Sequence, residues 1–165
     1  MRSEGTHSWS RSETMAAETI RAELRTLHEL DPSSSRLLEA LACVLTRVAM
    51  ADEDISDCET VEMEGTVMRL AQLPPAQAVL AVEIAKQRTC LGGVGYTAAI
   101  SRDLRRQTDP RYRLELLHGL IDVACADGDL SDSEGAAIRR IATELGFTPQ
   151  LANELIEESR RSLHA

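Results

Sequence analysis

Residues 51–59 read Ala-Asp-Glu-Asp-Ile-Ser-Asp-Cys-Glu, and residues 126–134 read Ala-Asp-Gly-Asp-Leu-Ser-Asp-Ser-Glu. The second segment repeats the pattern of the first at an offset of 75 residues. Apolar residues outside the two segments recur at the same offset, as Leu41 and Leu116 do. We interpret the chain as two copies of one unit, a helix followed by an acidic turn and a second helix, at about residues 36–74 and 111–149.

The residues around each acidic segment have helical patterns. Residues 37–50 are apolar nearly all round, which predicts a helix buried on most faces. Ser56 with Glu59, and Ser131 with Glu134, have the spacing of a capping box, in which each side chain accepts a hydrogen bond from the backbone N–H of the other residue. Further helical patterns cover about residues 13–30, 76–87, 97–106 and 148–163, and we expect the glycine-containing stretch 89–95 to join the two halves flexibly. The predicted fold class is all-α, a compact bundle of about seven to eight helices.

Length and composition agree with one helical domain. The chain has 165 residues, of which 43% are hydrophobic, enough for a substantial core. Aromatic residues make up only 2%, so Leu, Ala, Val and Ile must do the packing, which favours helices over sheets. We expect residues 13–165 to form a single domain, preceded by a polar, flexible tail at residues 1–12.

The net charge of −9 limits the choice of partners and location. Nucleic acids and anionic membrane surfaces attract clustered Lys and Arg, whereas the densest charge cluster here is acidic, so neither is expected as a partner. No stretch is apolar enough for a membrane span or a secretory signal, which predicts a cytoplasmic protein. The four cysteines lack metal-ligand spacing, and Cys43 and Cys125 in apolar runs are expected to be core thiols.

The acidic segments are the candidate functional site. Caps and favourable helix-dipole interactions need one or two carboxylates, yet residues 52–64 contain seven carboxylates and no basic residue. Hard cations such as Ca²⁺ or Mg²⁺ prefer oxygen ligands of this kind. The candidate metal ligands are Asp52, Asp54, Asp57, Glu59, Asp127, Asp129, Asp132 and Glu134.

These turns are not EF-hand loops. The second half of such a loop is matched around Gly128 and Glu134, but Val123 and Cys125 stand where the first carboxylate ligands would be. One turn offers at most four nearby carboxylates, fewer than the six to eight oxygens that Ca²⁺ takes. Any binding is therefore expected in the millimolar or high-micromolar range, with both turns or water completing the shell.

The doubled motif, preceded each time by an apolar helix, resembles the TerB-like family, which includes tellurite-resistance TerB proteins and the N-terminal region of DjlA-type co-chaperones. The resemblance covers roughly residues 35–162. It implies a helical fold of about seven helices, an acidic surface that binds divalent cations, and a role in resistance to tellurite and other stresses. The positions that match the family's acidic motif are Asp52, Asp54, Glu59, Asp127, Asp129 and Glu134.

The chain departs from the family pattern at two points. Glu53 stands where the first copy would usually have glycine, which leaves the geometry of that turn open. No His-Pro-Asp tripeptide occurs, so a J-domain and direct co-chaperone action are not supported.

The sequence offers no catalytic residues. The four histidines are scattered, and His118 lies in an apolar helical pattern typical of a core histidine. No nucleophile motif is found, so we expect a protein that is not an enzyme. Two functions remain: a stress-response module that binds divalent cations weakly, or a protein–protein interaction or oligomerisation domain whose acidic turns only cap helices and solubilise the surface. The partners expected are proteins, with a basic surface as the natural complement to the turns, or a second copy of the chain.

Overall fold

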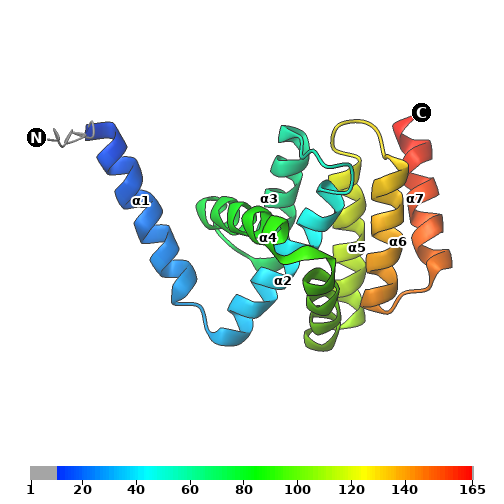
Figure 1. Ribbon diagram of the computed structural model, residues 1–165, viewed down its shortest axis with the longest axis horizontal. Coiled ribbons are helices and arrows are strands. Elements are labelled where there is room, and N and C mark those ends of the chain that lie inside the picture. Colours follow the sequence, from blue (N-terminus) through cyan, green and yellow to red (C-terminus); the bar gives the residue numbers. More distant parts are fainter. Residues whose placement is uncertain (1–10, 165) are drawn as a thin grey trace, which may run out of the picture.

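The computed structural model describes residues 11–164, with side chains described for 18–27, 29–90 and 98–164. This part of the chain forms helices joined by short turns, without a strand, so the predicted all-α class is confirmed (Figure 1). Residues 1–10 of the predicted tail lie outside the described residues, whereas Arg11 and Ser12 belong to the first helix. The helices are α1 (Arg11–His28), α2 (Pro32–Ala49), α3 (Asp57–Ala71), α4 (Pro75–Gln107), α5 (Pro110–Ala124), α6 (Asp132–Leu145) and α7 (Pro149–Leu163).

Local signals set most helix boundaries. Asp109 caps α5 by accepting a hydrogen bond from the Tyr112 N–H at 2.8 Å, and Pro110 takes the first helical position, where its missing N–H is not needed. Thr148 and Pro149 open α7 in the same way. Gly146 ends α6 in the left-handed conformation with φ 93°, which glycine adopts without a steric penalty.

The core lies between the helices that flank the two acidic turns. Helices α2 and α5 contribute the most completely buried apolar faces, and α3 and α6 pack against them. The largest fully buried side chains in this group are Leu41, Leu45, Met63, Leu116, Leu117, Leu120, Ile138, Ile141 and Leu145. This packing brings both turns to the same end of the bundle, at the top of Figure 1.

The expected flexible connection at residues 89–95 is wrong, because α4 is one helix of 33 residues that runs through it. A glycine inside a helix costs only about 1 kcal/mol relative to alanine. Both ends of α4 are held by burial: Val82 and Ala85 lie in the core on one side of the glycines, and Ser101 and Leu104 on the other. Tertiary packing therefore outweighs the weak helix propensity of the middle.

The cysteines are free, and their burial follows the prediction in part. Cys43 is fully buried, Cys125 is half-buried, and Cys58 and Cys90 are exposed. The expectation of a core histidine at His118 is wrong, since this residue is exposed on α5. A residue inside an apolar run can still face water, because a helix at the surface of a bundle keeps one face outside the core. Within the described residues no helix has both the length and the apolarity needed to cross a membrane.

Candidate functional site

The two acidic turns have the same backbone conformation. Glu53 has a φ of 72° and Gly128, its counterpart, a φ of 96°, so both lie in the left-handed region. The Glu53 N–H donates to the Met50 carbonyl at 3.2 Å, and the Gly128 N–H donates to the Cys125 carbonyl at 3.0 Å. Glutamate in place of glycine at position 53 therefore does not change the conformation of the first turn. The first turn keeps its geometry, and Glu53 bears the strain that Gly128 avoids.

An aspartate closes each turn. The Asp52 carboxylate accepts a hydrogen bond from the Asp54 N–H at 3.4 Å, and the Asp127 carboxylate accepts one from the Asp129 N–H at 3.2 Å. This local bond is the usual reason for aspartate in a turn. The hydrogen bonds give Asp52 and Asp127 a structural role. The side chains of all four aspartates are nevertheless exposed to water.

Both predicted capping boxes are present. The Ser56 N–H donates to Glu59 Oε2 and the Ser131 N–H donates to Glu134 Oε2, each at 2.7 Å. In return, the serine hydroxyls accept from the glutamate N–H groups at 3.1 and 3.2 Å. The glutamates are only 3% and 5% exposed, which is unusual for a carboxylate.

The glutamates of the two turns are electrostatic neighbours. Burial raises the pKa of the Glu134 carboxyl, the hydrogen bonds from Ser131 oppose that rise, and the negative charges of Glu59 and Asp52 add to it. Glu59 Oε1 is buried and has no hydrogen-bond partner among the described residues. The negative charge of the first turn therefore acts on the buried carboxyl group of the second turn.

Cys125, beside the second turn, has a raised pKa for similar reasons. Burial raises the pKa of Cys125 to about 11, and the charges of Asp122, Glu134 and Asp127 contribute to the rise. The thiol is thus kept protonated and unreactive at neutral pH.

Arg160 partly compensates the negative charge of the second turn. Its guanidinium donates to Asp132 Oδ1 at 3.1 Å and to the Leu130 carbonyl at 3.2 Å, reaching the turn from α7. No local sequence pattern predicts this role of Arg160, because its two partners lie 28 and 30 residues away along the chain. Asp132 is fully exposed, so the pair is screened by solvent and adds little stability.

The eight candidate ligands lie at one end of the bundle but do not converge on one point. The six aspartates are exposed, whereas Glu59 and Glu134 are buried below them. Among the described residues no three Asp, Glu, His or Cys side chains are arranged closely enough to hold a metal ion. Metal ligation by Asp52, Asp54, Asp57, Glu59, Asp127, Asp129, Asp132 and Glu134 stays a prediction.

Residues 38–155 match the family model described as tellurite resistance protein TerB. The chain belongs to the TerB family. The match runs from within α2 to within α7, so it contains both acidic turns and leaves α1 outside the TerB region. Comparisons with curated proteins and with solved structures give no match. The resemblance drawn from the doubled acidic motif is confirmed.

Proposed function

We propose that this TerB-family chain is a non-enzymatic, cytoplasmic binding module of the tellurite-resistance type, whose paired acidic turns attract divalent cations weakly. One observation carries the proposal. Glu59 and Glu134, one from each turn, are both buried, the negative charge of Glu59 helps to raise the pKa of Glu134, and Glu59 keeps an oxygen without a hydrogen bond among the described residues. A buried carboxylate oxygen without a donor is costly, and a cation is one partner that would relieve it.

The affinity follows from the same geometry. Because no three ligands converge, a cation must draw the exposed aspartates inward or keep much of its water shell. Both costs reduce affinity, and flexible sites that are rich in water fall in the range of about 0.1–1 mM that is known for weak Ca²⁺ modules. Such a site would respond to large changes of cation concentration and would not hold a permanent ion.

A binding role suits the glutamates better than acid–base catalysis. One oxygen of Glu134 accepts the Ser131 N–H at 2.7 Å, and the side chain is 5% exposed. A general acid or base must reach the proton of a bound substrate. Glu134 is instead held by its own helix cap, which supports a role in shaping the turn and its charge.

Calorimetric titration with Ca²⁺, Mg²⁺, Mn²⁺ and Zn²⁺, combined with thermal unfolding, tests the proposal. The key variant is the double change Glu59→Gln and Glu134→Gln, because glutamine at this position still completes a capping box but carries no charge. Glu154→Gln, at an exposed position on α7, is the matched control for loss of a carboxylate. We expect binding heat and a rise of the melting temperature for the wild type and for E154Q, and neither for E59Q/E134Q. Equal responses in all three proteins, or none in the wild type at several times the expected dissociation constant, would refute cation binding at this site.

A second candidate function is a pure protein-interaction domain. It is favoured by the complete capping boxes and by the Arg160–Asp132 pair, which give structural reasons for several of the acidic residues. In that case neither the wild type nor the double variant D52N/D127N should bind cations in the titration, and the double change should leave the stability nearly unchanged. Loss of a captured basic partner on this change, without any effect of added metal, would identify direct electrostatic recognition.

A further inference from the structure

Opposite charges lie at the two ends of α6. The second acidic turn precedes this helix, and both acidic turns lie at the top of Figure 1. At the other end of α6, a Cβ placed on Gly146 would lie 2.7 Å from the guanidinium carbon of Arg105, so this arginine of α4 lies against the end of α6. A helix of 14 residues is about 20 Å long. The acidic turns and Arg105 are therefore separated by about the length of one helix.

Arg105 belongs to a basic face of α4, which we call the arginine face. It consists of Arg102, Arg105 and Arg106, which are three and four residues apart and therefore lie on one side of the helix. All three side chains are exposed, and none forms an ion pair with a described residue. Residues 102–113 contain five arginines and only two aspartates, although the net charge of the whole chain is −9. This segment is therefore basic within an acidic protein.

A contact from α5 fixes the end of α4 that carries the arginine face. Arg113 Nη1 donates to the Arg105 carbonyl at 2.8 Å and to the Thr108 carbonyl at 3.0 Å. These bonds satisfy carbonyl groups at the end of α4 that have no partner within the helix. The arginine face is thus built on a helix end that is held in place.

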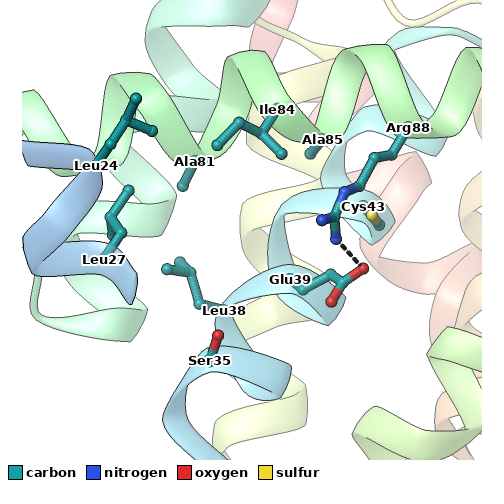
Figure 2. A pocket seen from close by; sticks show the side chains of 10 residues that line it. All are labelled: Leu24, Leu27, Ser35, Leu38, Glu39, Cys43, Ala81, Ile84, Ala85 and Arg88. Carbon is teal, nitrogen blue, oxygen red and sulfur yellow. Dashed lines mark hydrogen bonds and ion pairs between the residues drawn. The ribbon is translucent and has the colours of Figure 1, made fainter. Parts of the chain in front are cut away.

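Neighbouring acids leave the arginine face uncompensated. Asp103, the acid within this part of α4, lines a cavity between α4 and α2 together with Arg36. Arg88, nearer the start of α4, is in contrast paired with Glu39 of α2 (Figure 2). The arginine face therefore presents its positive charge to water.

The acidic end lacks positive partners in the same way. Five of its side chains are exposed and form no ion pair with a described residue: Asp52, Glu53, Asp54, Asp127 and Asp129. Below them, Glu59 is 3% exposed and keeps an oxygen without a hydrogen bond among the described residues. At physiological ionic strength the Debye length is about 8 Å, less than half the length of α6, so the two ends are screened from each other within one chain.

We propose that the arginine face of one copy of this chain docks on the acidic turns of a second copy. The inference rests on the second candidate function, because it names the basic partner of the turns as the chain itself. A guanidinium matches a carboxylate through two parallel N–H groups, which suits arginine to this contact. Because the contact joins two different surfaces, each added copy leaves one arginine face and one pair of turns free. Copies therefore assemble end to end, in strings or rings, and not as a twofold dimer.

Sedimentation velocity of the full chain at rising concentration tests the docking, at low salt and in about 1 M NaCl, where the Debye length falls to about 3 Å. We expect a mass that rises beyond that of a dimer at low salt and returns to the monomer at high salt. The variant R105E/R106E should weaken the association about tenfold or more, because attractive charge pairs become repulsive. R102E/R106E, which leaves Arg105 against Gly146, should act alike.

The matched control is R21E/R25E, which reverses two exposed arginines of α1 and should keep the wild-type association. E53R/D54R reverses two exposed charges of the first turn and should weaken association as R105E/R106E does.

A mixture of wild type and R105E/R106E tests the direction of the contact. This variant keeps its acidic turns and can receive the arginine face of a wild-type chain, but it cannot extend the string. It should therefore bind wild-type chains and shorten their assemblies. Because its turns are intact, its own cation titration reports separately on the proposed cation site.

Circular dichroism of the same samples establishes that the variants are folded. A wild-type chain that stays monomeric up to about 1 mM at low salt overturns the proposal. Association that R105E/R106E leaves unchanged, or that R21E/R25E weakens equally, overturns the use of the arginine face. Association that E53R/D54R leaves unchanged overturns the use of the turns, and assemblies that stop at two copies overturn the end-to-end arrangement.

Discussion

Replacing Glu53 with glycine should stabilise the protein. Glu53 has a φ of 72° at the position where the second turn has Gly128 with a φ of 96°. A left-handed conformation costs a residue with a Cβ about 1–2 kcal/mol, and glycine is free of that cost. Glycine also gives the unfolded chain more freedom, which offsets about 0.4–1 kcal/mol. The net gain expected for E53G is therefore about 0.5–1 kcal/mol, or roughly 1–4 °C in melting temperature for a chain of this size.

Urea unfolding at neutral pH measures this effect, through the midpoint at constant slope. Glu53→Gln is the control, since it removes the charge from the acidic cluster but keeps the Cβ and hence the backbone strain. The reciprocal change Gly128→Ala should destabilise the protein by about 1 kcal/mol, because a Cβ there meets no atom within 4 Å and the whole cost comes from the backbone. If E53Q stabilises as much as E53G, the gain is due to charge and the strain argument is refuted. A stability loss in E53G would refute it as well.

Three further changes probe the charge and the packing. The pKa of Glu134 is raised in the folded state, so its contribution to the free energy of unfolding is fully present below the ordinary pKa of 4.5 and is lost as the pH rises through the folded-state pKa. Urea unfolding from pH 4 to 8 should show this loss in the wild type and not in E134Q. Arg47→Ala should cost about 3 kcal/mol, because it leaves Glu144, paired with Arg47 at 2.6 Å, largely buried without its partner; R47A/E144A should recover part of this loss in the same assay. Gly119→Ala should cost about 1–3 kcal/mol, since the added Cβ would lie 2.7 Å from Thr66 Cγ2, and Thr66→Ser in the same chain should relieve the clash as judged by the melting temperature.

The acidic turns were the most predictable part of the molecule. Each capping box joins residues only three positions apart, so its two hydrogen bonds depend on the local sequence alone. The same holds for the Asp109 cap and for the left-handed end of α6 at Gly146. The doubled motif also led correctly to the TerB family, which the match over residues 38–155 confirms.

Predictions failed where a distant contact outweighed a local preference. The glycine stretch at residues 89–95 favours a break in the helix. Helix α4 nevertheless continues through it, because Val82 on one side and Leu104 on the other are buried in the core. His118 sits in an apolar run, yet it faces water, since the orientation of α5 against its neighbours sets which side is covered. No pattern within a few residues contains that information.

The sequence by itself determined most of the helical segments, where most helices start and stop, and that acidic turns occur twice, because these features rest on hydrogen bonds and periodicities within one or two helical turns. Only the tertiary structure decided that Glu59 and Glu134 are both buried, that the charge of Glu59 acts on Glu134, and that Arg160 reaches Asp132 from α7. It also decided that α1 projects from the bundle with Ile20 half exposed. These relations join residues far apart in the chain, and they follow from how whole helices pack against one another.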